Sequence, residues 1–503
     1  MQHKKNEIGH NPITLFTKGF PDVKVYINSV VNDGGELFFM IREGFESFLI
    51  IHSAKTDRYT GRKITTGGLK FVKCPLNHDN AEILREQFPF TKPVLVGKRN
   101  SYGLGDRLGN AGPAHLQSIR KTEFVPVLAQ QSIRELERTG RTAEDVLDAA
   151  SWSVFREGYR DGFGADGDHL KTTNDIDLMV KAGFTMFTID PSEYVANEAL
   201  GMSEEDLHSN FEKLPWDLLD EHSNEFLDRM VGASFVLEDG FELIPSKREI
   251  LAGMVKYGRV ISHTKKLADY LRDTHSGHPA ELELSVDETD QPTTLFEHLL
   301  IASELKRLGV ELVSLAPRFC GDFEKGIDFK GDLEEFKKEY RQHLAIAEKF
   351  GGYKLSIHSG SDKFSVYEAI GLLNAGAVHV KTAGTSYLEA LRTVAEANPT
   401  LFRQILRFSI TRFDEDKKSY HISGRPENIP DLKSLKNTEL KNLLDHDDTR
   451  QVLHVSYGSV LHGQGEVSVA FKKQLMETLT KNEALYESNL LRHFERHLAP
   501  FDS

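Results

Sequence analysis

Residues 281–288 read Glu-Leu-Glu-Leu-Ser-Val-Asp-Glu. Apolar and polar residues alternate with a period of two, which predicts a β-strand. Its polar face carries Glu281, Glu283, Ser285 and Asp287. Residues 353–360, Tyr-Lys-Leu-Ser-Ile-His-Ser-Gly, repeat the pattern with a polar face of Lys354, Ser356 and His358. Strands of this kind fit the wall of a parallel barrel, with the apolar face against helices and the polar face inside.

Short apolar runs alternate with helical patterns from about residue 93 onward, which is typical of βα units. The runs lie at 93–97, 124–129, 162–166, 184–190, 282–287, 310–316, 353–358 and 378–382. Eight runs with helical connections predict a (β/α)8 TIM barrel. A doubly wound sheet with six strands is the main structural alternative.

Three regions follow from these patterns. Residues 1–90 predict a small β-rich N-terminal element, residues 91–400 the barrel, and residues 401–503 a helical C-terminal extension. The barrel contains a helical insertion at about 195–277, where Ser203-Glu-Glu-Asp forms a capping-box pattern. Because it follows the carboxyl end of a strand, the insertion is a candidate lid, although a packing appendage or an oligomer contact fits equally well.

Composition narrows the class of protein. The 503 residues carry a formal charge of −14, which disfavours nucleic acid and anionic membranes as partners. Two cysteines, no apolar run of membrane-spanning length and no secretory leader predict a cytoplasmic protein. A homo-oligomer is left open.

Polar residues at the ends of these runs are the candidates for chemistry. Glu283 is expected to face the barrel interior, where a carboxylate is costly unless it is paired, metal-bound or protonated, so it predicts an acid/base, a ligand or a structural ion pair. His358 ends its strand and fits a ligand, an acid/base or a structural histidine. Asp166 and His169 lie in an Asp- and Gly-rich block whose glycines free the backbone, although the block could also be an ordinary turn. Imidazole and carboxylate together suit Zn2+, Mn2+ or Ni2+.

Cations near the strand ends could bind a carboxylate or hydroxyl groups. The candidates are Lys98, Arg99, Arg107, Arg318 and Lys381. Taken singly, a cation of this kind is more often a surface charge or part of a structural pair. The stretch 103–109 has the spacing GxGxxxG, which departs from the dinucleotide fingerprint, so no nicotinamide is expected.

Several longer motifs occur together in the chain. They are GKRNSYGLGDRLG at 97–109, GADGDHLKT at 164–172, VDETDQPTT at 286–294, SIHSGSDKF at 356–364, VHVKTAGTSYLEALR at 378–392 and RQVLHVSYGSVL at 450–461. Over residues 90 to 465 the chain resembles the tagaturonate epimerase family. The resemblance implies interconversion of D-tagaturonate and D-fructuronate in hexuronate breakdown, assisted by a divalent metal and an acid/base pair.

The resemblance also implies roles for residues. Asp166, His169, Glu283 and His358 match motif positions of the family, and Arg450 and His454 lie in a further motif that could contact substrate. We hypothesise that His169, His358 and Glu324 hold the metal while Asp166 and Glu283 exchange protons. Fructose and tagatose are expected as secondary substrates.

The chemistry constrains the mechanism. The two ketouronates differ at a carbon β to the ketone, so enolisation cannot invert it. Retro-aldol cleavage and re-addition is the route that we favour over transient oxidation by a nicotinamide. A metal-dependent aldolase, a ketose isomerase and a non-catalytic sugar-acid binding protein are the rival interpretations.

Overall fold

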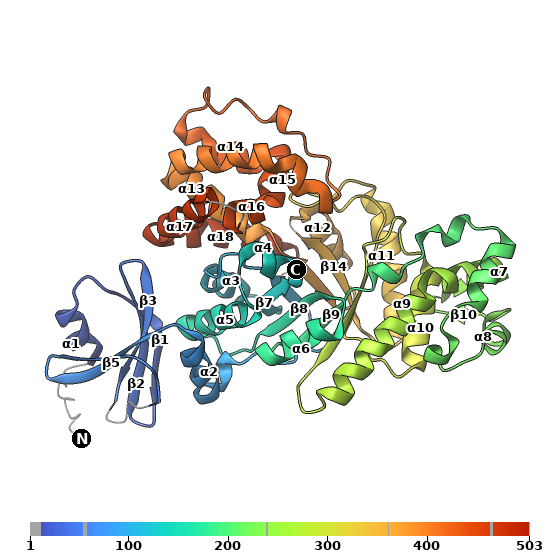
Figure 1. Ribbon diagram of the computed structural model, residues 1–503, viewed down its shortest axis with the longest axis horizontal. Helices are drawn as coiled ribbons and strands as arrows, with labels where there is room; N and C mark the ends of the chain where they lie inside the picture. Colours follow the sequence, from blue (N-terminus) through green and yellow to red (C-terminus); the bar gives the residue numbers. More distant parts are fainter. Residues whose placement is uncertain (1–11, 54–57, 238–239, 361, 463–465, 502–503) are drawn as a thin grey trace, which may run out of the picture.

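The computed structural model describes residues 12–53, 58–237, 240–360, 362–462 and 466–501. Its centre is a closed barrel of parallel strands (Figure 1). In chain order the strands are β6 (Ser101–Leu104), β7 (Val125–Ser132), β8 (Gly164–Leu170), β9 (Met186–Ile189), β12 (Glu281–Val286), β13 (Ser314–Pro317), β14 (Lys354–Gly360) and β15 (Val378–Thr382). Since β9 pairs with β12 and β15 pairs with β6, the sheet has no edge. The predicted (β/α)8 barrel is confirmed, and the doubly wound alternative is excluded.

The first barrel strand was predicted in the wrong place. Residues 93–97 form no strand, and the first strand is β6, which begins at Ser101. Instead, the backbone N–H groups of Val96 and Gly97 donate to the carboxylate of Glu281, at the amino end of β12. The segment that precedes β6 therefore lies at the end of the barrel opposite the carboxyl ends of the strands.

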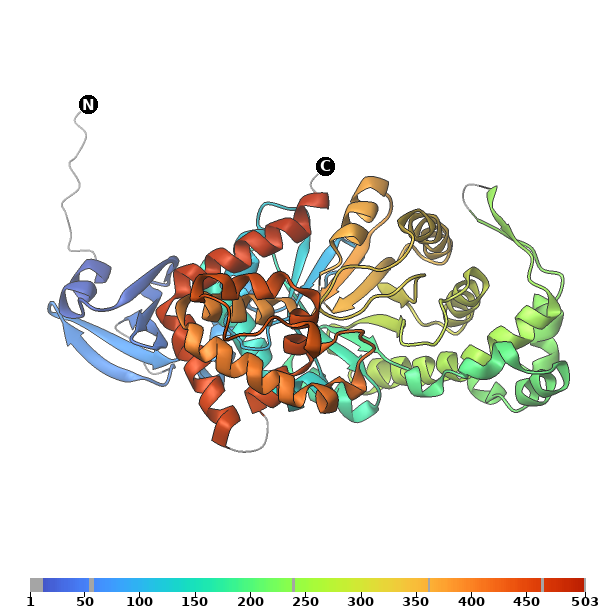
Figure 2. The ribbon, with the colours of Figure 1, turned by 90° about the horizontal axis from the view of Figure 1, so that it is seen from above.

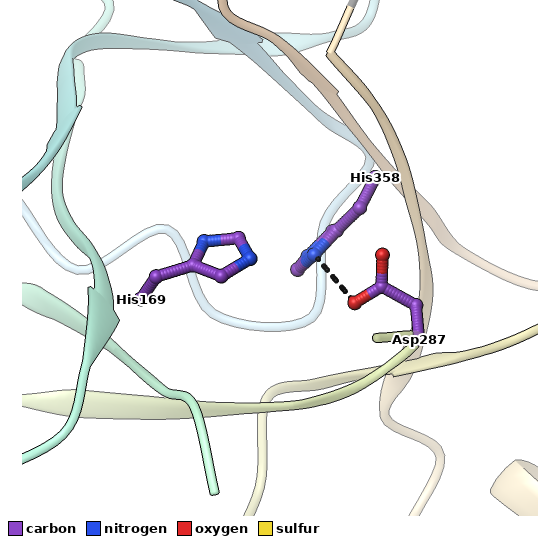
Figure 3. Close-up of side chains that lie close together, drawn as sticks. All are labelled: His169, Asp287 and His358. Atoms are coloured by element: carbon purple, nitrogen blue, oxygen red, sulfur yellow. Dashed lines mark ion pairs between the residues drawn. The ribbon is translucent and has the colours of Figure 1, made fainter. Parts of the chain in front are cut away.

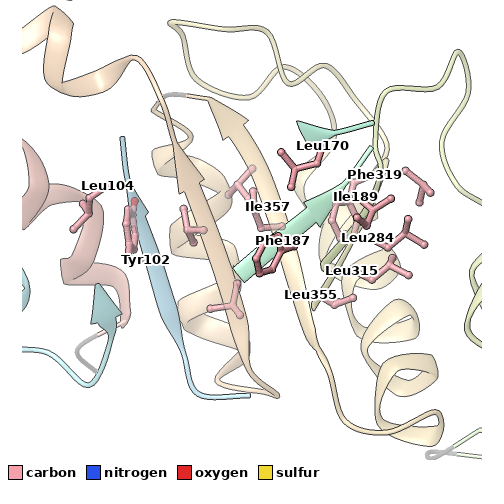
Figure 4. Close-up of a cluster of buried hydrophobic side chains, with 14 of the residues drawn as sticks. Tyr102, Leu104, Leu170, Phe187, Ile189, Leu284, Leu315, Phe319, Leu355 and Ile357 are labelled. Carbon is pink, nitrogen blue, oxygen red and sulfur yellow. The ribbon is translucent and has the colours of Figure 1, made fainter. Parts of the chain in front are cut away.

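A helix follows each barrel strand and covers its apolar face. These helices are α3 (Gly112–Ile119), α5 (Ala143–Glu157), α6 (Thr173–Ala182), α9 (Lys247–Thr274), α10 (Leu295–Arg307), α11 (Leu333–Lys349), α12 (Phe364–Leu373) and α13 (Thr385–Ala397). Outward-facing residues such as Phe187, Leu284 and Leu355 are fully buried against them (Figure 4). Burial of each such side chain stabilises the fold by about 1.5–3 kcal/mol. The alternating residues of β12 and β14, among them Glu283, Ser285 and His358, point into the barrel and are polar.

A separate antiparallel sheet forms the N-terminal element. Its order is β1-β2-β3-β5-β4, with strands β1 (Lys24–Asp33), β2 (Glu36–Glu43), β3 (Glu46–His52), β4 (Arg62–Thr66) and β5 (Leu69–Pro75). One face packs on α1 (Pro12–Gly19) through Phe16, and the other packs on α2 (His78–Gln87) and α5 through Phe155. This sheet is the β-rich N-terminal element expected from residues 1–90.

The insertion between β9 and β12 is helical, as expected. It contains α7 (Glu204–Glu212), α8 (Ser223–Met230), a hairpin of β10 (Phe235–Val236) and β11 (Glu242–Leu243), and most of α9. The Ser203 side chain accepts a hydrogen bond from the Asp206 N–H and so caps α7. Figure 2 shows this insertion projecting away from the barrel as a long arm.

The C-terminal helices pack against one side of the barrel. They are α14 (Pro399–Asp416), α15 (Asp447–Val455), α16 (Tyr457–His462), α17 (Glu466–Lys481) and α18 (Glu483–Leu498). The last of them packs on α3 and α13, and the segment after α14 reaches the carboxyl ends of the strands. Within the described residues, no helix has both the length and the apolar character needed to cross a membrane.

Candidate metal and substrate site

An irregularity at the end of β8 places two neighbouring polar side chains at the mouth of the barrel. The pairing of β8 with β9 shifts register between Gly167 and Leu170, and His169 has a φ of 53°. A bulge of this kind allows Asp168 and His169 both to point towards the site. A positive φ is uncommon at residues other than glycine, and strained backbone of this kind clusters at functional sites. The unusual backbone conformation of this Asp- and Gly-rich block therefore occurs at His169, whereas the sequence had suggested the glycines on either side of Asp166.

Three side chains from different strands converge at this mouth (Figure 3). His169 comes from β8, Asp287 directly follows β12, and His358 comes from β14. One ligand atom of each lies within 4.8 Å of the others, and His358 Nδ1 is 3.3 Å from Asp287 Oδ1. Two imidazoles and one carboxylate are a donor set that suits Zn2+, Mn2+ or Ni2+.

The other nitrogen of each histidine contacts a carboxylate. His169 Nδ1 lies 2.7 Å from Asp168 Oδ1, and His358 Nε2 lies 2.7 Å from Glu283 Oε1. Carboxylates in these positions fix the tautomer and orientation of metal-binding histidines in known metal sites. His169 Nε2 and His358 Nδ1 are thereby directed towards Asp287. Glu283 itself is fully buried.

The electrostatics of the cluster favour a cation. Burial alone would lower the pKa of His169, but the Asp168 carboxylate raises it to about 10. Burial would likewise raise the pKa of Asp287, but His358 and His169 hold it below its ordinary value. The cluster therefore attracts positive charge, and a proton and a metal ion compete for the same nitrogens. The residues present fit a divalent metal.

Lys381 joins the carboxylates inside the barrel. Its Nζ lies 2.7 Å from Asp166 Oδ2, 2.9 Å from Asp168 Oδ1 and 2.7 Å from Glu283 Oε1. Burial would lower the pKa of Lys381, but the three carboxylates raise it well above its ordinary value. Burial raises the pKa of Asp166 to about 6, although Lys381 opposes this shift. The orientation of both histidines thus depends on carboxylates that share one lysine.

Two adjoining cavities open beside the cluster. The larger has a volume of about 450 Å³ and the smaller about 50 Å³, and His358 lines both. The larger is within the range of small-molecule sites. The cations that line it are Arg134, Arg318 and Lys325, and the C-terminal extension contributes Tyr420. None of the described residues lining either cavity belongs to the 195–277 insertion, so the lid hypothesis stays a prediction.

Comparison with known proteins identifies the family. The model of the tagaturonate epimerase family matches residues 26–501 of the chain. The protein belongs to this family. It is an isomerase of the type that acts on carbohydrates.

Individual members of the tagaturonate epimerase family are similar over nearly the whole chain. The tagaturonate/fructuronate epimerase of Thermotoga maritima is 41% identical over 487 residues, which cover 96% of this chain and 97% of that protein. The glycerol-complexed crystal structure of fructuronate-tagaturonate epimerase UxaE from Cohnella laeviribosi has a TM-score of 0.90 and 38% identity, covering 97% of this chain and 98% of that one. The native crystal structure of the same protein has a TM-score of 0.89 and 37% identity, and the match covers 97% of this chain and 98% of that one.

One metal ligand predicted for this tagaturonate epimerase family protein lies elsewhere. The structure does not bring Glu324 to the two histidines; its carboxylate accepts hydrogen bonds from Lys330, Ser423 and Gln451. Asp287 takes the place that was predicted for Glu324 as the third ligand beside His169 and His358. The physical reason is that Glu324 follows β13 in a long connection, whose path the strand pattern does not determine.

Three predicted substrate contacts also lie away from the cavities. Lys98 donates to the carbonyl of Gly351, and Arg99 donates to the carbonyls of Val96 and Leu95. Both precede β6 and so lie at the opposite end of the barrel, which follows from the misplaced first strand. The buried guanidinium of Arg450 is occupied by Asp362 and by the carbonyls of Gly326 and Leu444.

The remaining predicted contacts do lie at the mouth. Arg107, Lys381 and His454 line the smaller cavity, and Arg318 lines the larger. Arg107 is paired with Glu135 at 3.0 Å, and Lys381 is surrounded by carboxylates, so neither cation is free of acidic partners. Burial holds the pKa of His454 well below its ordinary value, and nearby cations lower it further. The predicted acid/base pair, Asp166 and Glu283, is fully buried and lines neither cavity.

Some residues of the site were not among the predicted ones. Asp287 lies on the polar face of residues 281–288, and Asp168 lies in the Asp- and Gly-rich block, so both carried a signal in the sequence. Arg134 lies two residues beyond the end of β7 and was not singled out, whereas Lys325 and Tyr420 lie in long connections without a strand pattern.

Proposed function

We propose that this protein interconverts D-tagaturonate and D-fructuronate with the help of a divalent metal. The observation that carries the proposal is the cluster of His169, Asp287 and His358, with each histidine oriented by a carboxylate, beside a cavity of about 450 Å³. Family membership supports the substrate, because relatives 37–41% identical over almost the whole chain are named for these two ketouronates.

His169 Nε2, His358 Nδ1 and the Asp287 carboxylate would hold the metal. Zn2+, Mn2+ and Ni2+ suit this donor set, and the metal would act as a Lewis acid towards the substrate ketone and its neighbouring hydroxyl group. Asp168 and Glu283 keep the two imidazoles in the required tautomers. Lys381 balances the charge of both carboxylates.

Retro-aldol cleavage and re-addition is the route that we propose for the inversion. A carboxylate removes the proton of the hydroxyl group on the carbon to be inverted, and the bond towards the ketone side breaks. Its electron pair moves to the ketone-bearing fragment, which becomes an enediolate, while the other fragment becomes an aldehyde. After the aldehyde turns, the bond forms on its other face and the new alkoxide is protonated.

The proton acceptor and donor must reach the substrate. Three carboxylates line the smaller cavity: Glu135 is paired with Arg107, Asp168 contacts Lys381 and His169, and Glu288 lies 4.0 Å from His169 Nε2. We assign the proton exchange with substrate to Asp168 and Glu288, because both lie beside His169 in the proposed metal site. The sequence suggested Asp166 and Glu283 for this role. Both instead form ion pairs with Lys381, which also pairs with Asp168, and so they affect the charge around Asp168.

The proposal is tested with chelator-stripped protein and D-tagaturonate, with and without added Mn2+, Zn2+ or Ni2+. The products are followed by NMR in the absence of any nicotinamide, and D-tagatose and D-fructose are tested in parallel. We expect D-fructuronate to form when a metal is added. Net accumulation of two three-carbon fragments would indicate an aldolase instead, and no conversion with any metal would contradict the proposed function.

A further inference from the structure

Two cations at the mouth of the barrel form no ion pair with any carboxylate that the structure describes. Arg134 and Lys325 line both cavities, and in the described parts of the chain neither forms an ion pair within 4 Å. Arg318 is similarly unpaired but lines the larger cavity alone. The two cations and His358 therefore all lie where the two cavities adjoin.

This arrangement contrasts with the other cations at the mouth. Arg107 is neutralised by Glu135, and Lys381 by three carboxylates. In a chain of 62 basic and 76 acidic side chains, acidic partners are plentiful, yet Arg134 and Lys325 pair with none of the described ones. Glu288 lines both cavities together with Arg134 but forms no ion pair with it among the described contacts. An anionic ligand would find both cations available.

Arg134 is also held in position. It lies in the first turn of α4 (Ile133–Thr139), which Ser132 caps through the Glu135 N–H. Its guanidinium carbon lies 5.4 Å from the centre of the Tyr420 ring, and the Tyr420 hydroxyl accepts a hydrogen bond of 2.6 Å from Arg138. A guanidinium that stacks on a fixed ring is well placed to bind a carboxylate through two parallel hydrogen bonds.

The chemistry of the proposed reaction needs such a partner. A ketouronate carries its carboxylate at the end remote from the ketone, and the carbon to be inverted lies between them. Cleavage between that carbon and the ketone side leaves the carboxylate on the aldehyde fragment. This fragment must turn without leaving, and its carboxylate is the group by which the protein can hold it while the aldehyde carbon rotates.

We propose that Arg134 and Lys325 form the carboxylate subsite and retain the aldehyde fragment between cleavage and re-addition. This inference rests on the proposed function for its reaction, but the carboxylate subsite can be tested without turnover. Uronates are then favoured over neutral ketohexoses because the neutral sugar offers these cations no charge. Loss of the two cations should weaken carboxylate binding and also let fragments escape.

The first test measures binding by isothermal titration. The probes are L-galactonate, which keeps the carboxylate and the hydroxyl configuration of D-tagaturonate but has no ketone, and galactitol, which is neutral. Arg134→Gln and Lys325→Met should each weaken galactonate binding by about 10- to 100-fold, as expected for a charge-assisted hydrogen bond, and leave galactitol unchanged. Lys98→Met is the matched control, since Lys98 lies at the opposite end of the barrel. Equal galactonate affinity in all four proteins, or no preference of the wild type for galactonate over galactitol, would overturn the subsite.

The second test measures turnover. In Arg134→Gln and Lys325→Met, kcat/KM for D-tagaturonate should fall, and the dihydroxyacetone released per epimerisation should rise; Arg134→Lys should recover part of both. Variants that lose activity without any increase in released fragment would refute the retention role. Failure of the wild type to convert D-tagaturonate would contradict the proposed function, whereas the binding test would still decide the subsite.

Discussion

Replacement of Lys381 by Met removes the cation that three buried carboxylates share, while it keeps the length of the side chain. Lys381 is 3% exposed and both Asp166 and Glu283 are 0% exposed, so the two carboxylates would lose their cation inside the protein. Removal of one partner from a buried ion pair typically costs about 3–5 kcal/mol. Asp166 limits the loss by taking up a proton, because burial already raises its pKa to about 6. We therefore expect Lys381→Met to lower the free energy of unfolding by about 3–5 kcal/mol in total. The loss should not be three times as large, although three carboxylates lose their cation.

The assay is urea unfolding of chelator-treated protein near neutral pH, so that metal binding does not contribute to stability. Lys354→Met is the matched control, because Lys354 is another fully buried lysine inside the barrel. Its Nζ donates to the Gly97 carbonyl at 2.7 Å and to Ser101 Oγ at 3.1 Å, and it forms no ion pair with a described carboxylate. We expect this control to lose about 1–3 kcal/mol.

A double-mutant cycle decides whether the carboxylates cause the difference. Asp166→Asn removes one of the charges that Lys381 balances, so Lys381→Met should cost less in that background. Additive losses, or a loss for Lys381→Met no larger than that for Lys354→Met, would refute the shared-cation interpretation.

Further predictions concern the metal and the proton exchange. Asp287→Asn should weaken Zn2+ or Mn2+ binding by more than about 100-fold, because partners outside the ligand set alone contribute about 10- to 100-fold; metal retention after dialysis, measured by mass spectrometry, checks this. Glu324→Gln should keep the bound metal, and loss of the metal would restore Glu324 as a ligand. Burial opposes ionisation of Glu324, but hydrogen bonds from Gln451, Ser423 and Lys330 lower its pKa to about 2 in the folded protein. Because this pKa is lower than that of the unfolded chain, the ionised carboxylate stabilises the fold at pH values above about 4. The destabilisation by Glu324→Gln should therefore be largest near neutral pH and shrink as the pH falls from about 4 towards 2, which measurement of the unfolding free energy at each pH will show. Asp168→Asn should reduce kcat by about 10^2- to 10^4-fold, and near-normal turnover would remove it from the proton exchange.

The strands that alternate strictly could be predicted from sequence because their period is local. Glu283 and His358 face the barrel interior as expected, and each lies on a strand with regular aliphatic residues on its other face. The first strand could not be found in this way. It is four residues long, reads Ser-Tyr-Gly-Leu, and lies close after the more apolar run at 93–97. That single error moved Lys98 and Arg99 to the wrong end of the barrel.

The parts of the site that sequence could not supply come from long connections and from distant segments. Glu324 lies in the connection between β13 and α11, where no periodicity limits the path of the backbone. Tyr420 lies in the C-terminal extension and reaches the cavity because the segment after α14 lies at the mouth of the barrel. Such contacts depend on how distant segments pack together, and no local pattern in a single sequence predicts that packing.

The way in which the site is assembled limits how it could work. A TIM barrel hosts many reactions, so the fold by itself says little about which one occurs. Here β8 and β14 each contribute a histidine, the residue after β12 contributes the carboxylate, and β15 contributes the lysine that balances the carboxylates behind both histidines. Because β15 closes the barrel against β6, the lysine reaches the carboxylates of β8 and β12 only across the closed interior. The position of Lys381, and with it the orientation of the metal-binding histidines, therefore depends on closure of the barrel at β15. A variant that loosens β15 should weaken metal binding even though it changes no ligand.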